Sequence, residues 1–313
     1  MIAKLKFMPV ASTGLALSLI TIFNTLYSFF NNSFLLIIAI ILGLFFIGKI
    51  ILKNIFHFQI FLSELKHPII GSFIPTLSMA IMALSGSISI FNLLIAQIFW
   101  IIGLIIHIAL LISFIYFRFK FKDFNKILPS WFIPTIGTTV AIISGSLIGF
   151  IVVSKILFIF TILFVFILVP IVLYRIMFLG ILKKSIYPVI GIIGAPFNLT
   201  LGAFVLLFPI ANQLNILILN FLTITAFLST LIIYLSFLHL KYITFSPLYV
   251  SYTFPLAIGA FSTLKYSQYL TNNSLPFANA WYYISCIETA VAIIMISYVA
   301  YKILLHIYKI YKV

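Results

Sequence analysis

Acidic residues are almost absent from this chain, which has three of them, Glu64, Asp123 and Glu288, among 313 residues. Charged residues make up 7% of the sequence and hydrophobic residues 65%, whereas a soluble domain carries about 25% charged residues. The one cysteine, Cys286, excludes an internal disulfide. Glycine-rich phosphate loops and HExxH or CxxC metal motifs are also missing. The sequence therefore predicts a membrane protein that is not an enzyme and has no cofactor.

Long apolar runs occupy most of the chain. Ten of them are near or above the roughly 20 residues that an α-helix needs to cross about 30 Å of hydrocarbon. Their approximate limits are 9–30, 34–56, 68–84, 91–117, 129–150, 156–179, 187–209, 215–238, 247–266 and 278–305. They predict an all-α polytopic membrane protein with ten transmembrane helices. The net charge of +15 is then explained by lysines that flank the spans, so no nucleic-acid partner is expected.

Basic residues lie almost entirely on one side of these spans. The amino terminus, the segments after even-numbered spans and the carboxyl terminus together hold 16 of the 18 lysines and arginines. Lys155 and Lys265 are the exceptions. Because basic residues concentrate in cytoplasmic segments, the distribution predicts an integral protein of the plasma (cell inner) membrane with both termini in the cytoplasm.

Prolines recur with a period of about 60 residues. Nine of the 12 follow this period in odd-numbered spans, at positions 9, 68, 75, 129, 134, 188, 196, 247 and 255. The tetrapeptide Phe-Ile-Pro-Thr occurs at both 73–76 and 132–135. The period predicts one transmembrane domain, residues 1–313, of five helical-hairpin repeats with approximate limits 1–60, 61–122, 123–182, 183–240 and 241–313. A proline-broken helix in lipid needs protein or water around its freed backbone groups. Odd helices are therefore expected to form an inner pore ring, and even helices an outer ring.

Two polar side chains within the spans are candidates for chemistry. Glu288 is the only acid in a span, and its position in an even helix favours a structural hydrogen bond or a subunit contact over a role in transport. His107 lies in the middle of another even span and is expected to be structural. Cation pathways normally use rings of Asp or Glu, and no odd span contains either residue. The transported solute is therefore expected to be an anion or a neutral molecule.

Four short motifs are typical of one known family: Lys-His-Pro at 66–68, Leu-Pro-Ser-Trp at 128–131, Ala-Pro-Phe at 195–197 and Thr-Phe-Pro at 253–255. With its ten spans and five hairpins, nearly the whole chain resembles the tellurite-resistance/C4-dicarboxylate transporter (TDT) family, which includes plant slow anion channels, fungal malate and sulfite transporters and bacterial relatives. The resemblance implies a homotrimer in membrane lipid, with one pore per protomer. It also implies passage of small inorganic or organic anions, and a pore-blocking phenylalanine that corresponds to Phe254.

The second proline of each odd-numbered span after the first is here called the inner proline; these are Pro75, Pro134, Pro196 and Pro255. Residues beside the inner prolines are expected to line this pore. Phe254 has Thr13, Ile74, Ile133 and Ala195 as its counterparts in the other repeats, and it alone among the five is aromatic. An apolar ring in a narrow path stops ions by excluding water, so Phe254 is predicted to be the gate. The complete predicted lining is Thr13, Gly14, Ile74, Pro75, Ile133, Pro134, Ala195, Pro196 and Pro255.

A lysine precedes each odd-numbered span, at Lys6, Lys66, Lys126, Lys184 and Lys241. These lysines either form a basic ring that raises the anion concentration at the cytoplasmic mouth, or serve only to fix topology. Two mechanisms stay open. An anion channel is favoured, because spans one to nine lack a mid-membrane Lys or Arg that could grip a carboxylate. The alternative is a secondary carrier, with or without proton coupling, for C4-dicarboxylates, sulfite or tellurite-type oxyanions.

Overall fold

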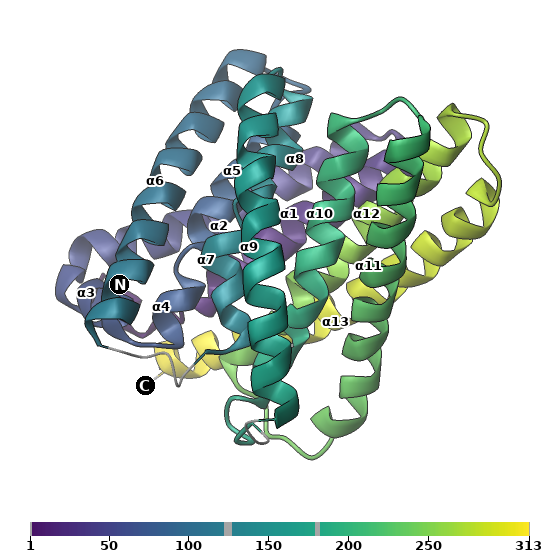
Figure 1. Ribbon diagram of the computed structural model, residues 1–313. Coiled ribbons are helices and arrows are strands. Elements are labelled where there is room, and N and C mark those ends of the chain that lie inside the picture. The colour runs from purple at the N-terminus through teal and green to yellow at the C-terminus, as the bar shows by residue number, and fades with distance from the viewer. Residues whose placement is uncertain (1, 122–126, 179–181, 313) are drawn as a thin grey trace.

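The structure is a computed structural model that describes residues 2–121, 127–178 and 182–312 (Figure 1). All regular structure in these residues is helical. The elements in chain order are η1 (Ile2–Phe7), α1 (Ala11–Phe30), α2 (Ser33–Phe56), α3 (Phe58–Lys66), α4 (Ile70–Phe73), α5 (Thr76–Ile88), α6 (Leu93–Lys120), η3 (Pro129–Trp131), α7 (Phe132–Ile136), α8 (Thr139–Leu147), α9 (Ile151–Phe178), η4 (Tyr187–Gly194), α10 (Ala195–Leu207), α11 (Gln213–Leu240), η5 (Pro247–Tyr252), α12 (Thr253–Asn272) and α13 (Ala278–Lys312), where η denotes a 3-10 helix.

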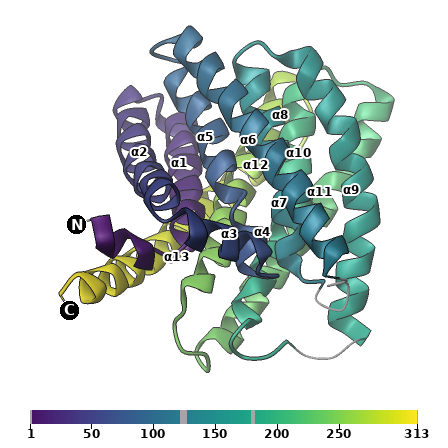
Figure 2. The same cartoon turned by 90° about the vertical axis from the view of Figure 1, so that its left-hand side faces the viewer.

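Five helices form a closed ring at the centre of the molecule. The contacts run from α1 to α5, α8, α10 and α12, and from α12 back to α1. Each of these helices also packs against the next long helix of the chain, which is α2, α6, α9, α11 or α13 respectively. Figure 2 shows α1 beside α2 and α5 beside α6. The prediction of an inner ring of odd helices and an outer ring of even helices is therefore confirmed.

Burial differs sharply between the two rings. The inner helix α12 buries 16 of its 20 residues, whereas the outer helix α9 buries 5 of its 28. A helix that exposes a continuous apolar surface is suited to lipid, and one that is enclosed by other helices is not required to be apolar. The outer helices therefore provide the lipid-facing surface, while the inner ring is free to carry polar side chains.

Nine helical segments within the described residues are long and apolar enough to cross a membrane. The remaining predicted span is the ninth, residues 247–266, which corresponds to η5 and α12 and extends further, to Asn272. Its more polar sequence is tolerated because α12 contacts α1, α10, α11 and α13. Its place in the inner ring, rather than its hydropathy, identifies it as a span.

In two of the inner spans, prolines mark helix starts instead of bends within continuous helices. Pro188 and Pro247 begin or nearly begin the 3-10 segments η4 and η5, and Pro196 and Pro255 lie in the first turns of α10 and α12. The first N–H groups of a helix have no intrahelical acceptor, so proline is tolerated there without a lost hydrogen bond. Each of these two inner spans is thus a 3-10 segment followed by an α-helix.

Asparagine caps define one end of the bundle, here called the asparagine end. The side chains of Asn32, Asn92 and Asn212 accept backbone N–H groups in the first turns of α2, α6 and α11. Such caps satisfy donors that the helix itself leaves unpaired. The same three helices finish with basic residues in or after the last turn, at the opposite or basic end.

The short helix α3 at the basic end is not among the predicted elements. It follows α2 directly, and Glu64 on α3 forms an ion pair with Lys53 on α2 at 2.5 Å. Lys53 Nζ also donates to the carbonyl of Met8, after η1, at 2.9 Å. Lys53, which the sequence interpretation assigned only to topology, therefore joins α2, α3 and the segment after η1. Glu64 lies on the helix α3 and not in a loop, where the sequence interpretation placed it.

Candidate functional site: the central path

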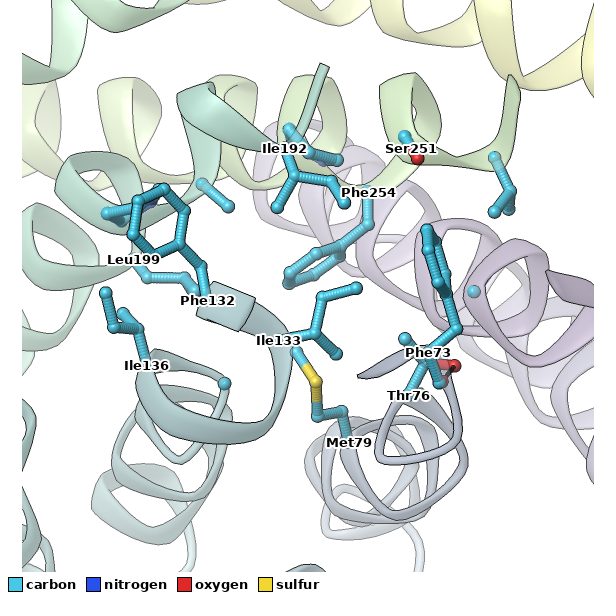
Figure 3. A pocket seen from close by; sticks show the side chains of 16 residues that line it. Phe73, Thr76, Met79, Phe132, Ile133, Ile136, Ile192, Leu199, Ser251 and Phe254 are labelled. Atoms are coloured by element: carbon cyan, nitrogen blue, oxygen red, sulfur yellow. Dashed lines mark hydrogen bonds between the residues drawn. The ribbon is translucent and has the colours of Figure 1, made fainter. Parts of the chain in front are cut away.

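A small apolar cavity lies where the five inner spans meet (Figure 3). Its volume is about 30 Å³. A water molecule needs roughly 10–15 Å³ of such space, so the cavity accommodates about two waters and no hydrated ion. All five inner spans contribute to the lining, which includes Gly14, Phe73, Thr76, Met79, Phe132, Ile133, Ile136, Ile192, Ala195, Pro196, Leu199, Val250, Ser251, Phe254 and Pro255. This central cavity is the narrow part of the path through the ring.

The Phe254 ring forms one wall of this cavity. Phe254 is the second residue of α12 and is 8% exposed. Figure 3 shows its ring near the middle of the cavity, with Ile192 and Ile133 on opposite sides of it. Phe254 also lines a second, larger cavity. The Phe254 side chain is therefore shared by the walls of the two cavities.

Two further aromatic residues narrow the same cavity. Phe73 and Phe132 line it beside Phe254, and Figure 3 shows them on either side of the Phe254 ring. The sequence interpretation missed both, because it compared the single residue before each inner proline. The sequence nevertheless marks both residues, because Phe73 and Phe132 are the first residues of the repeated Phe-Ile-Pro-Thr tetrapeptide. The constriction is thus built from three phenylalanines and not from one.

Few polar atoms reach the central cavity. Thr76 Oγ1 donates to the carbonyl of Phe73 at 2.6 Å and lies 2.5 Å from Thr13 Oγ1, so its proton is engaged. Ser251 Oγ is buried and has no hydrogen-bond partner among the described residues. The Ser251 hydroxyl is therefore a polar group of the cavity lining whose hydrogen-bonding capacity is unused within the described residues.

The second cavity, here called the vestibule, opens from Phe254 towards the asparagine end. Its volume is about 200 Å³. Its walls mix apolar residues with hydroxyl and amide side chains, and one charged residue lines it: Thr21, Asn24, Tyr27, Ser28, Leu36, Ala83, Gly86, Ser89, Ile90, Val140, Ile143, Ser144, Leu147, Phe254, Ile258, Phe261 and Lys265. None of these residues is acidic. The vestibule is thus roomier and more polar than the central cavity, and its charge is positive.

The predicted pore-lining residues fall into three groups. Gly14, Ile133, Ala195, Pro196 and Pro255 line the central cavity together with Phe254. Thr13 and Ile74 line a different small cavity, between the inner ring and the α2–α3 segment. Pro75 and Pro134 line neither, and their carbonyls lie against the His107 ring of the outer helix α6. The side chains at equivalent distances from the inner prolines therefore do not all face the path.

Four of the five predicted ring lysines are described, and Lys126 lies outside the described residues. Lys6, Lys66, Lys184 and Lys241 are all exposed. None of the four lines the central cavity or the vestibule. Any effect they have on anions in the path therefore acts through the long-range field and not through contact.

The two polar residues of the outer spans are buried within the protein. His107 Nδ1 lies 2.9 Å from Ser78 Oγ, which donates to the carbonyl of Pro75 at 2.8 Å. Since the hydroxyl has one proton, Nδ1–H of His107 is the donor to Ser78. Glu288 on α13 is 4% exposed and hydrogen-bonds Thr263 on α12. Neither side chain lines the central cavity or the vestibule.

Lys265 and Asn24 are the functional candidates that the sequence interpretation left out. Lys265 was one of two exceptions to the basic-residue asymmetry, and that exception was the available signal. The expectation that spans one to nine lack a mid-membrane Lys or Arg did not consider Lys265, which lies at the end of the predicted span 247–266 and lines the vestibule from α12. Asn24 gave no signal of its own, because a single amide in an apolar helix is common.

A closed ring of five helix pairs around a narrow path is the architecture of a polytopic channel or transporter. Comparison with known proteins specifies the family. The family described as "Voltage-dependent anion channel", SLAC1, matches residues 7–304. The chain belongs to this family, which is the TDT family predicted from the motifs. Membership supports a general function in the transport or conduction of anions by an integral membrane protein.

Individual relatives match over a shorter stretch. The uncharacterized transporters MJ0762 and MJ0576 of Methanocaldococcus jannaschii are 35% and 33% identical over 91 residues, 28% of this chain. The aligned stretch spans 27% and 26% of the length of these relatives, about a quarter of each. Their names agree with a transport function and identify no solute.

Proposed function

We propose that the protein is an anion channel with one path per protomer, closed by the side chain of Phe254. The observation that carries this proposal is the position of Phe254, which lines both the central cavity and the vestibule. Around it the walls are almost entirely apolar, and an apolar constriction stops ions because water leaves it. The described lining contains no carboxylate, so the path offers nothing that would attract cations.

The alternative is a secondary carrier, with or without proton coupling, for C4-dicarboxylates, sulfite or tellurite-type oxyanions. Its support is the buried carboxyl of Glu288, which hydrogen-bonds Thr263 on the helix that carries Phe254. Against it, a carrier needs a substrate site near the midpoint of the membrane, and the central cavity has no charged lining residue. Uphill anion uptake into sealed vesicles under an imposed pH gradient would favour the carrier, whereas passive flux alone would favour the channel.

We further propose the orientation and assembly that accompany a channel. The basic end faces the cytoplasm of a plasma (cell inner) membrane, with both termini there, in accordance with the positive-inside rule. Lys6, Lys66, Lys184 and Lys241, with Lys126, then raise the local anion concentration, an effect that weakens with salt as the Debye length shortens. Family resemblance favours a homotrimer in lipid. Light scattering of the purified protein tests the trimer, and labelling of a cysteine placed at Asn32 tests the orientation.

The test of the gate is the flux of small anions after Phe254→Ala. Nitrate efflux from liposomes is expected to rise at least about 100-fold, since about 2.7 kcal/mol of barrier corresponds to that factor and an ion in a dry site costs several kcal/mol. The order of preference among anions should stay the same, because the substitution leaves the polar and charged side chains of the vestibule in place. Phe46→Ala is the matched control, since Phe46 is a buried phenylalanine on the outer helix α2. A folded Phe254→Ala protein with parental flux would refute the gate.

A further inference from the structure

One face of α12 carries both Phe254 and a charged side chain. Phe254, Ile258, Phe261 and Lys265 all line the vestibule, and their spacing of three or four residues places them on one face of the helix. At 1.5 Å per residue, Lys265 lies about 16 Å along the axis from Phe254. The helix that closes the path therefore also provides the cation at the far side of the vestibule.

The ammonium group of Lys265 has no carboxylate partner. Its Nζ donates to Gln268 Oε1 at 3.0 Å and lies 5.6 Å from the centroid of the Phe261 ring. No acidic residue lines the vestibule, and the ion pair found within the described residues joins Lys53 and Glu64 at the basic end. An ammonium has three N–H donors, so two donors and the full charge remain for a ligand.

Asn24 presents a second donor from an adjacent inner helix. It lies on α1, and its Oδ1 accepts the hydroxyl proton of Ser87 at 2.9 Å. That hydrogen bond fixes the amide, so the Nδ2 hydrogens are the part of Asn24 that remains for a ligand. By contrast, the vestibule hydroxyls of Thr21, Ser28, Ser89 and Ser144 donate to carbonyls of their own helices. Lys265 and Asn24 are therefore the nitrogen donors that line the vestibule, and the hydroxyl of Tyr27 is a further, uncharged donor there.

We propose that Lys265 and Asn24 form an anion-binding site in the vestibule, and that this site selects small monovalent anions such as inorganic oxyanions, halides or monocarboxylates. The inference rests on the proposed function in that the site supplies ions to the Phe254 gate. A single ammonium neutralises one negative charge. The second charge of a dianion would find no second cation among the residues that line the vestibule, and an unpaired charge among apolar walls and neutral hydroxyls is costly. The volume of about 200 Å³ leaves room for the anion and several waters.

The site can be tested by equilibrium binding, without any transport. Thermal unfolding of the full-length protein in detergent is followed with increasing nitrate, with gluconate at equal ionic strength as the reference, because a bound ligand raises the midpoint. Lys265→Gln is expected to weaken nitrate binding about tenfold, the effect of losing one charge-assisted hydrogen bond, and Lys265→Arg to retain it. Succinate at neutral pH should bind the parent at least about tenfold more weakly than nitrate.

Lys155→Gln is the matched control. It removes the same charge from an exposed position on α9, where Lys155 lies 5.8 Å from the Phe208 ring and lines neither the central cavity nor the vestibule. Nitrate binding should be unchanged in this variant. Equal nitrate binding by the parent and Lys265→Gln would overturn the site, and succinate binding as tight as nitrate would overturn the monovalent preference.

Flux measurements separate this proposal from the proposed function. In the Phe254→Ala background, adding Lys265→Gln should raise the nitrate concentration that gives half-maximal flux about tenfold, and adding Lys155→Gln should not. Absence of anion flux in Phe254→Ala would refute the channel, while the binding measurements would still decide the site. Flux with identical concentration dependence in all three proteins would keep the channel and refute the role of Lys265.

Discussion

Replacement of Lys53 by methionine should destabilise the basic end strongly, although it conserves the length of the side chain. Lys53 is 1% exposed, and its ammonium group contacts both Glu64 on α3 and the Met8 carbonyl next to η1. Methionine would fill the same space and remove the charge. Glu64 would then keep a carboxylate that is 15% exposed with no cation to pair with.

The magnitude follows from the burial of the pair. Removing one partner of a buried ion pair costs about 3–5 kcal/mol. Glu64 retains partial access to water, so the lower end, about 3 kcal/mol, is expected for Lys53→Met. Because a buried pair is often replaced by apolar residues at little cost, the double variant Lys53→Met/Glu64→Leu should lie within about 1 kcal/mol of the parent.

The assay is a double-mutant cycle of unfolding free energies measured in mixed micelles. Lys53→Met, Glu64→Leu and the double variant should give a coupling energy of at least about 2 kcal/mol, because Lys53→Met alone costs about 3 kcal/mol and the double variant at most about 1 kcal/mol. Lys120→Met is the control, since Lys120 is an exposed lysine at the end of α6. If Lys53→Met costs no more than Lys120→Met, the ion pair does not hold α2, α3 and η1 together.

Two further substitutions examine the helix that carries the gate. Gly191→Ala would place a Cβ 2.8 Å from the backbone carbonyl oxygen of Ser251 in η5. The substitution should lower the free energy of unfolding by about 1–3 kcal/mol and raise basal nitrate flux. Stability equal to that of the parent would contradict the tight η4–η5 contact. Glu288→Gln keeps an acceptor for Thr263 on α12 and should change nitrate flux in the Phe254→Ala background by less than about twofold, within the effect of a weak hydrogen-bond change. A loss of tenfold or more would instead place the Glu288 carboxylate in the transport mechanism.

The ring of helices could be predicted from the sequence, whereas the side chains that face its centre could not. Span length and proline period can be read directly from the order of residues along the chain, and both led to the correct ring order. The direction in which a side chain points is harder to predict, because a shift of one residue rotates the side chain by about 100° around an α-helix. Gly14 and Thr76 therefore face the central cavity, while their neighbours Thr13 and Ile74 reach a different one.

The 3-10 segments add to this uncertainty. A 3-10 helix has three residues per turn instead of 3.6, so equal distances from a proline give different orientations when one span contains such a segment and another does not. The spans with η4 and η5 begin in this way, whereas α1 is α-helical throughout. The winding depends on tertiary contacts, which a proline pattern does not describe.

Lys265 shows how a statistical rule can hide a candidate functional residue. Counted with the other basic residues, it was a minor exception to an asymmetry of charge. Whether Lys265 can meet an anion depends on which face of α12 carries it. The packing of α12 against α1, α10 and α13 determines where that face lies. A residue that violates the rule for topology is thus a candidate for function, because topology does not explain why it is there.

The enclosed position of α12 also bears on how the protein is made. Membrane insertion of a single helix depends on its own hydrophobicity, and a lysine near the centre of a span costs about 2.5–3.5 kcal/mol. Although α12 is 20 residues long, it is not among the nine described segments apolar enough to cross alone, so it needs partners to stay in the bilayer. The apolar helix α13 follows it and packs along it. In the ring, the first four hairpins form an open arc that the last hairpin closes, so α12, which carries Phe254, is the last inner helix in chain order.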